Sequence, residues 1–389
     1  MRWHDVIAKA IASLFCLFVW RLSLRTLSRC VPTYAGEQKY FPKHLINDDH
    51  ALNRYRLNIS EQIYPRLRKQ ADHFSPLEIR IIASDRRQNY LAQVITFLVD
   101  AYQSHKQLSP SLEICNVEPE VFEELRKFKM HVPIRTLGRR SSRSSRMNET
   151  IAKEAADYWK CLNHTTKGRI NTRNEDSSYI MLLEDDALVV PEFARLMTSL
   201  MDQLDRRQHI DYVKMYHPNQ LRKIPSIPLV INFIIYEISS HFYQKFQAIS
   251  ICILVCCTYC IVIFRRVLLF WSLLTSSLMY LELRSYGSQF LADVRYYLTD
   301  TVYLSSPESC CTPAVLFRAS KVPEILPQLS LETRRSARTG HAKDHILDES
   351  PFVGRQTDMN LVVHIGAMSS VRKRRITLNE VIAVQARND

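Results

Sequence analysis

The chain has 389 residues, of which 46% are hydrophobic and 10% aromatic, so it can bury a sizeable core, which argues against widespread disorder. Its formal net charge of +13 suits an anionic membrane surface or a phosphate-bearing substrate; because the scattered Lys and Arg form no zinc-finger, RNA-binding or helix-turn-helix pattern, nucleic acid is the least favoured partner. The seven glycines form no GxGxxG motif or phosphate loop, which argues against Rossmann dehydrogenases and P-loop NTPases.

The first apolar run, VIAKAIASLFCLFVWRL, covers residues 6–22. It has about the length of a signal-peptide core, but the basic and bulky stretch RLSLRTLSRC at its end offers no small-residue cleavage site. We therefore predict an uncleaved transmembrane signal anchor, with residues 1–5 in the cytosol. The alternative is a cleaved signal peptide.

The soluble part begins with strand and helix patterns in alternation. LEIRIIAS (77–84) has the β-branched density of a buried strand, and apolar residues at helical spacing follow within residues 85–105. SLEICNVEP (111–119) predicts a second strand, and VFEELRKF after it predicts a short helix. This order predicts an α/β fold with a mostly parallel sheet and covered faces.

The next segments continue the alternation. LGRRSSRSSRMNET (137–150) is rich in Ser and Arg and predicts a solvated loop, and a helix is expected over 151–162. The apolar run at 179–183 predicts a strand, and Pro191 suits the first turn of a helix after it. DYVKMYH (211–217) alternates as a half-buried strand does.

A pair of apolar segments interrupts the soluble pattern. FQAISICILVCCTYCIVIF covers residues 246–264 without a charge, and a second apolar segment covers 267–283 after two arginines. Two such segments around a short basic turn predict a transmembrane hairpin with the turn in the cytosol; the alternative is two buried core helices. Because a hairpin returns the chain to the side it left, both flanking parts are expected in the lumen. CCTPAVLFRAS (310–320) and NLVVHIGAMSS (360–370) predict further strands.

The predicted divisions are the cytosolic N-terminus 1–5, the anchor 6–22, a lumenal lead-in 23–75, a first part of the soluble domain 76–245, the span 246–264, the turn 265–266, the span 267–283, and a second part with the tail 284–389. Glycosylation sequons at Asn58, Asn148 and Asn163 fall in the inferred lumenal part and support this topology mildly. Of the ten cysteines, five lie in apolar segments and five are too irregular for a zinc framework, so the sequence assigns no pairing.

The strand predicted at 179–183 ends in three consecutive carboxylates, Glu184, Asp185 and Asp186. Ligands of an open parallel sheet bind beyond the carboxyl ends of its strands, where these side chains are expected. Three adjacent carboxylates repel one another, and a hard divalent cation held with substrate phosphates would neutralise them. The triplet therefore predicts a site for a metal and a nucleotide diphosphate. The alternative is that Asp185 or Asp186 caps the next helix and the rest faces solvent.

A series of motifs carries a family resemblance. YIMLLEDDALVVPEF, YVKMYHPNQLR, a two-span hairpin, CCTPAVLFRA, KDHIL and LVVHIG followed by SS occur in this order. The series resembles the post-GPI-attachment GalNAc-transferase family of three-span Golgi glycosyltransferases, over essentially the whole chain. The resemblance implies a GT-A glycosyltransferase domain split by the hairpin. It also implies inverting transfer of GalNAc from UDP-GalNAc to the first mannose of a GPI glycan, with Mn²⁺ or another divalent metal.

Carried over by position, the triplet Glu184, Asp185 and Asp186 corresponds to the family's motif for donor and metal, with Asp186 also catalytic. The remaining residues expected to hold the nucleotide follow the first two strands, and they are Ala83, Ser84, Arg86, Arg87 and Glu118. The alternative for Glu118 is a surface glutamate before a proline.

Two residues near the C-terminus complete the predicted site. Asp344, in KDHIL, is the expected base, because an inverting displacement needs a base beside the attacking hydroxyl. Asp348 and Glu349 are the reserves for that role, and an exposed charged loop is the alternative. His364 ends an apolar run and is the expected further metal ligand; the alternative is a satisfied core histidine.

Two other functions stay open. A related transferase that uses UDP-GlcNAc on N-glycans would carry a comparable acidic motif but leaves the hairpin unexplained. A catalytically inert membrane scaffold would bind no UDP-sugar and would tolerate Asp185→Ala and Asp186→Ala. Under the leading hypothesis we expect a multi-pass protein of the Golgi membrane with a lumenal catalytic domain. Its expected partners are GPI-anchored proteins or the GPI glycan as acceptor and Golgi lipids, with no nucleic acid.

Overall fold

The computed structural model describes residues 3–30, 40–45, 48–67, 75–86, 88–103, 109–138, 147–163, 178–217, 269–305, 312–340 and 343–366. The chain divides into two compact units. One unit comprises Met1–Tyr34 and Asn219–Asp300, and the other comprises Ala35–Pro218 and Thr301–Asp389. Each unit therefore combines segments that are distant in the sequence.

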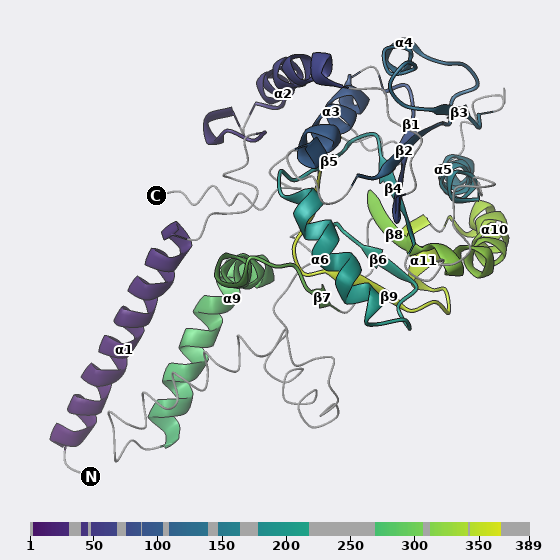
Figure 1. Ribbon diagram of the computed structural model, residues 1–389. Helices are drawn as coiled ribbons and strands as arrows, with labels where there is room; N and C mark the ends of the chain where they lie inside the picture. Colours follow the sequence, from purple (N-terminus) through teal and green to yellow (C-terminus); the bar gives the residue numbers. More distant parts are fainter. Residues whose placement is uncertain are drawn as a thin grey trace. The chain divides into compact units, whose positions relative to one another are not determined.

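The second unit contains most of the helices and all the strands that the structure describes (Figure 1). Its helices are η1 (Lys43–Leu45), α2 (Asp49–Ile63), η2 (Tyr64–Arg66), α3 (Tyr90–Gln103), α4 (Glu123–Arg126), α5 (Met147–Leu162), α6 (Phe193–Asp205), η5 (Ala319–Lys321), α10 (Val322–Thr339) and α11 (Lys343–Asp348). Its strands are β1 (Leu77–Ala83), β2 (Ser111–Asn116), β3 (Ile134–Thr136), β4 (Tyr179–Glu184), β5 (Ala187–Val189), β6 (Tyr212–Lys214), β7 (Leu304–Ser305), β8 (Ala314–Arg318), β9 (Gly354–Thr357) and β10 (Val362–His364).

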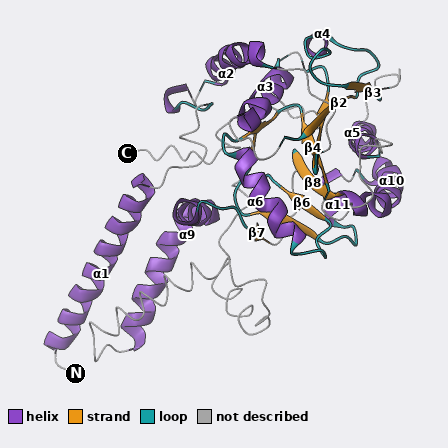
Figure 2. Cartoon of the chain, in the orientation of Figure 1, coloured by secondary structure: helices purple, strands orange, loops and turns teal. Residues whose placement is uncertain are grey.

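In the described part of the chain, eight strands form one mixed sheet in the order β3-β2-β1-β4-β8-β6-β9-β7 (Figure 2). Strands β3, β2, β1 and β4 are parallel, and β6 and β9 are parallel to each other, whereas β8 is antiparallel to both its neighbours. The register sets Ile82 of β1 opposite Cys115 of β2 and Glu184 of β4. The carboxyl ends of these three strands therefore meet at one edge of the sheet. The predicted α/β fold with a mostly parallel sheet is confirmed.

Helices cover both faces of the sheet. Helices α5, α10 and α11 pack on one another, and their apolar side chains form a core with residues of β2, β4, β6 and β8. Figure 1 shows α3 and α6 on the other side of the sheet, and these two helices also contact each other. Strand β4 is a nearly continuous apolar run because both of its faces are buried, whereas β1 also buries two charged residues, Glu78 and Arg80, which pair with each other at 2.9 Å.

Several predicted elements are confirmed and others need correction. Strands β1, β2, β4 and β8 coincide closely with or fall within the strands predicted from sequence. Pro191, however, does not lie in the first turn of α6, because that helix begins at Phe193 after Glu192. The predicted loop 137–150 ends earlier than expected because α5 begins at Met147, and its central residues 139–146 lie outside the described residues. The strands predicted at 211–217 and 360–370 are only the short β6 and β10.

The first unit contains the helices α1 (Trp3–Cys30) and α9 (Leu269–Thr299). The indole nitrogen of Trp20 donates a hydrogen bond to the carbonyl of Met279 at 3.3 Å, and Arg21 forms an ion pair with Glu282 at 2.8 Å. The span predicted at 6–22 lies within α1, most of the span predicted at 267–283 lies in α9, and the span at 246–264 lies outside the described residues. Among the residues described, we find no helix with both the length and the apolar character needed to cross a membrane.

Candidate functional site

The acidic triplet lies at the edge where β1, β2 and β4 end. Glu184 is the last residue of β4, and Asp185 and Asp186 form the turn that leads into β5. The backbone N–H of Asp185 donates to the carbonyl of Ile82 at 3.1 Å, which ties the turn to the end of β1. Because parallel strands end together, the triplet lies beside the residues that follow β1 and β2.

Asp185 and Asp186 share Arg86 as a partner and each has a further partner of its own, whereas Glu184 has a separate one. Asp185 accepts hydrogen bonds from the backbone N–H and the hydroxyl of Ser84 at 2.7 and 2.9 Å, and it pairs with Arg86 Nε at 2.9 Å. Asp186 forms ion pairs with Arg86 Nη1 and, at 3.2 Å, with His364 Nε2. The third carboxylate, Glu184, accepts from the ammonium of Lys343.

His364 reaches the triplet through a short two-stranded sheet. Strand β10 runs antiparallel to β5, with His364 opposite Ala187, the residue that follows Asp186. The N–H of Ile365 also donates to the carbonyl of Asp186 at 2.8 Å. The ring of Tyr216 lies 6.2 Å from the ring of His364. This pairing explains how two residues far apart in the sequence come into contact.

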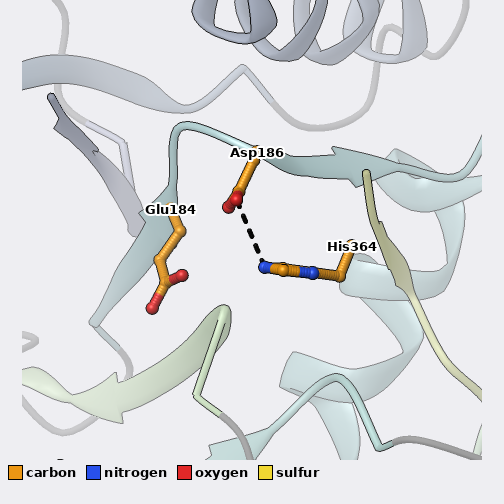
Figure 3. Close-up of side chains that lie close together, drawn as sticks. All are labelled: Glu184, Asp186 and His364. Atoms are coloured by element: carbon orange, nitrogen blue, oxygen red, sulfur yellow. Dashed lines mark ion pairs between the residues drawn. The ribbon is translucent and has the colours of Figure 1, made fainter. Parts of the chain in front are cut away.

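Glu184, Asp186 and His364 form a group that could hold a metal ion. Each offers one ligand atom, and these atoms lie within 4.8 Å of one another (Figure 3). Figure 3 shows the carboxylate of Asp186 facing the imidazole of His364. Asp186 is fully buried, and its Oδ1 has no hydrogen-bond partner among the described residues. Two carboxylates, one of them with this buried oxygen, and an imidazole suit a divalent cation such as Mn²⁺ or Mg²⁺.

Asp185 does not belong to this group. We predicted it as a metal ligand together with its two neighbours, but the structure turns its carboxylate toward Ser84 and Arg86. Asp185 is buried, and its carboxylate supports the end of β1. Asp185 and Asp186 share Arg86, but Ser84 holds the carboxylate of Asp185 whereas His364 meets that of Asp186.

Opposite charges favour the ionised forms of Asp186 and His364, whereas burial disfavours the ionised form of Asp185. Burial alone would raise the pKa of Asp186, but Arg86 and His364 outweigh it and lower that pKa. Burial would likewise lower the pKa of His364, but Asp186 raises it. For Asp185, burial dominates over the opposing charge of Arg86 and raises the pKa to about 6. The site is thus a compact network of compensated charges.

A cavity of about 460 Å³ opens beside the triplet. This volume lies in the range of small-molecule sites. Its lining residues follow β1, β2 and β4 or lie on α3, α5 and α11, and they are Ile82, Ser84, Asp85, Arg86, Gln88, Tyr90, Val117, Glu118, Thr150, Lys153, Glu154, Asp157, Tyr158, Glu184, Asp185 and Lys343. The cavity therefore joins the predicted nucleotide residues to one end of the candidate metal group.

The residues predicted for the nucleotide are distributed in three ways. Ser84, Arg86 and Glu118 line the cavity. Ala83 is fully buried in β1 and does not line it. The prediction for Arg87 falls outside the described residues.

The residue predicted as the base for the acceptor hydroxyl, Asp344, is not among the residues that line the cavity. It is half-buried on α11, and its charge acts on Lys214. The preceding residue, Lys343, is the one that reaches the triplet.

The sequence indicated Lys343 only as the cation beside the predicted base Asp344, and it gave Gly366 no role in the site. The motif KDHIL drew attention to Asp344, and no local pattern indicates which of two adjacent charges faces a strand 159 residues away. Gly366 follows β10, where an added Cβ would clash with Asp186 Oδ2 and lie 3.3 Å from Arg86 Nη1. The signal that could have found it is the presence of a glycine directly after the strand of His364, in a chain with few glycines.

Comparison with protein families gives one match. The sequence model of the family described as GPI-N-acetylgalactosamine transferase PGAP4 matches residues 77–363. The match begins at the first residue of β1 and ends in β10, so it covers well over half of the chain and includes the acidic triplet.

Proposed function

The chain belongs to the GPI-N-acetylgalactosamine transferase family, and from this premise we propose that it transfers GalNAc from UDP-GalNAc to the first mannose of the GPI glycan. We further propose that transfer depends on a divalent metal such as Mn²⁺, inverts the transferred sugar and takes place on a GT-A-type domain. The observation that carries this proposal is the group Glu184, Asp186 and His364 beside a cavity at the carboxyl edge of the sheet.

Each end of the cavity suits one part of the donor. Arg86 and Lys343 bring positive charge to the side of the triplet, where a diphosphate would lie. Glu118, at the end of β2, can accept hydrogen bonds from ribose hydroxyls or the uracil N–H. A divalent cation on the candidate group would supply charge stabilisation for the leaving diphosphate.

The acceptor side rests on Asp344. In the proposed reaction its carboxylate takes the proton of the attacking hydroxyl, as an inverting displacement requires. The support for this role is its position on α11, one residue after Lys343. Loss of turnover in Asp344→Asn with unchanged UDP affinity would support the role, and full turnover would assign the base to another residue.

The reaction is tested by UDP-sugar turnover of the purified full-length protein with a GPI-anchored acceptor. UDP-GalNAc, UDP-GlcNAc and UDP-Gal are compared, each with Mn²⁺ and with EDTA. Asp186→Asn should abolish transfer, whereas Asp202→Asn, an exposed acid on α6, should transfer like the wild type. Preference for UDP-GlcNAc with N-glycan acceptors would redirect the function, and absence of UDP-sugar binding by folded protein would favour an inert scaffold.

We also propose that the protein resides in the Golgi membrane with its catalytic domain in the lumen. The support is the apolar segments and sequons of the sequence, together with a disulfide between Cys115 and Cys161, a bond typical of oxidising compartments. Imaging against a Golgi marker and glycosidase sensitivity of the intact protein test this location. A cytosolic distribution without N-glycans would contradict it.

A further inference from the structure

Lys343 lies between the candidate metal group and the cavity. Its ammonium pairs with Glu184, lies 5.2 Å from the ring centroid of Tyr158, and lines the cavity. The side chain is 21% exposed, so the ammonium is partly removed from solvent. A lysine in this position can exchange one anionic partner for another without moving far.

Helix α11 fixes Lys343 at the edge of the cavity. Ile346 and Leu347 of this helix are buried in the core that it shares with α5 and α10. The hydroxyl of Tyr212 donates to the carbonyl of Leu347 at 3.2 Å, and Asp348 pairs with the fully buried Lys214. Because the helix is tied to the sheet in this way, its first residue is held beside Glu184.

The basic side chains that line the cavity in the described part of the chain differ in their partners. Arg86 pairs with Asp186 but also with Asp185, which lies outside the candidate metal group. Lys153 pairs with Asp157 on its own helix at 3.1 Å. Lys343, in contrast, is paired with Glu184, a member of the group. A metal that takes Glu184 therefore competes directly with the ammonium of Lys343.

We propose that Lys343 is a diphosphate-binding residue, whose ammonium exchanges Glu184 for a phosphate oxygen when a metal-bound nucleoside diphosphate enters the cavity. This inference rests on the proposed function and deepens it by naming the ligand of one residue. The exchange keeps the lysine protonated and paired in both states. The exchange also leaves the Glu184 carboxylate available to coordinate the metal ion.

The test is calorimetric binding to the purified full-length wild type, Lys343→Met and Lys129→Met, with Mn²⁺ alone, with UDP plus Mn²⁺ and with uridine. In Lys343→Met we expect UDP affinity to fall about tenfold or more, because a charge-assisted hydrogen bond is lost. Uridine affinity should stay unchanged, and Mn²⁺ alone should bind at least as tightly as in the wild type, because its competitor for Glu184 is gone. Lys129→Met removes one positive charge from an exposed position after α4, outside the cavity lining, and should bind UDP like the wild type.

Each outcome decides the proposal. Unchanged UDP affinity in Lys343→Met overturns it, as does an equal loss of UDP and uridine affinity, which would indicate a structural role. Lys343→Arg keeps the charge and should retain most of the UDP affinity; if Lys343→Met does not fold, a folded Lys343→Gln takes its place in the comparison. If the wild type binds no UDP, the proposed function itself is overturned. If the wild type binds UDP and Lys343→Met binds it equally well, only the role of Lys343 is overturned.

Discussion

At the level of single residues, the site shows how three adjacent carboxylates can coexist in a buried turn. Arg86 pairs with both Asp185 and Asp186, and one further partner meets each carboxylate: Lys343 at Glu184, Ser84 at Asp185 and His364 at Asp186. These pairings offset the mutual repulsion and the burial of the acids. Removing one cation would leave a buried charge uncompensated, so the network responds strongly to small changes.

Gly366 offers a change that acts on Asp186 without replacing it. In Gly366→Ala the added methyl would displace the buried Asp186 carboxylate, because that side chain is short and held by Arg86 and His364. We expect about a tenfold loss of Mn²⁺ affinity with a moderate loss of stability.

Calorimetric titration with Mn²⁺ measures the effect on Gly366→Ala, and Gly354→Ala is its matched control. At Gly354 an added Cβ would clash with the ring of Tyr212, away from the triplet. That variant should lose stability but keep its metal affinity. Equal Mn²⁺ affinities in Gly366→Ala and the wild type would show that the close approach has no part in the site.

Glu124 predicts a pH dependence of stability. Its carboxylate accepts from the N–H of Ala92 in the first turn of α3 at 2.7 Å. Burial raises its pKa to about 7 although this hydrogen bond and Lys127 lower it, and Asp185 and Asp85 add to the rise. A raised pKa means that the folded state binds this proton more tightly than the unfolded state does. The stability that this tighter proton binding adds is therefore fully present below the unfolded pKa of about 4.5, and it is lost as the pH rises through the folded pKa of about 7.

Glu124→Gln removes this titration and keeps an acceptor oxygen for Ala92. At pH 5 we expect the variant and the wild type to be equally stable. At pH 8 the variant should have an unfolding free energy about 1–3 kcal/mol higher than that of the wild type, and therefore a higher thermal midpoint. Thermal unfolding of both proteins at the two pH values measures the difference. A constant gap between the two proteins across this range would refute the assignment.

At the level of elements, α11 depends on a buried ion pair. Lys214 of β6 is fully buried and pairs with Asp348 at the end of the helix. Replacing either partner alone leaves a buried charge, so Lys214→Met and Asp348→Leu should each lose about 3 kcal/mol or more of stability. The double variant should lose clearly less than the sum, because no unpaired charge remains.

A double-mutant cycle of unfolding free energies tests this coupling. The single variants should also weaken UDP binding, since the helix that carries Lys343 loses its attachment to the sheet. Additive losses would show that the pair does not hold the helix. Stable single variants with normal UDP binding would separate α11 from the site altogether.

The elements also show what sequence patterns can and cannot predict. The apolar runs of β1, β2 and β4 predicted parallel strands, and strand ends that meet at one edge brought Ser84, Glu118 and Glu184 to one cavity. The direction in which each carboxylate points was not predictable from the sequence, because Asp185 and Asp186 lie in a turn, where neighbouring side chains do not follow the alternation of a strand. Nor was the position of α11, since its contacts with β4 and β6 span more than 130 residues of sequence. Local periodicity contains no information about such long-range contacts.

At the scale of the whole molecule, one covalent bond joins two walls of the cavity. Cys115 in β2 is bonded to Cys161 in α5, across 46 residues of sequence. Residues of α5 and of the loop after β2 line the cavity, among them Glu118, Glu154 and Tyr158. The sequence did not assign this pair, because cysteine spacing alone cannot choose a partner. The disulfide thus connects global stability to the shape of the cavity.

Cys115→Ser with Cys161→Ser should therefore lower both stability and donor affinity. Closing a loop of this length stabilises a fold by about 2–4 kcal/mol, and loss of the bond frees α5 to move relative to the end of β2. Thermal unfolding and UDP titration measure the two effects, with Cys16→Ser, which lies in α1 outside this disulfide, as the control for loss of a cysteine. Thiol alkylation of the wild type before and after reduction counts the bonded pair. If Cys115 and Cys161 both react without reduction in protein taken from the secretory pathway, the bond does not form, and the proposed lumenal location loses that support.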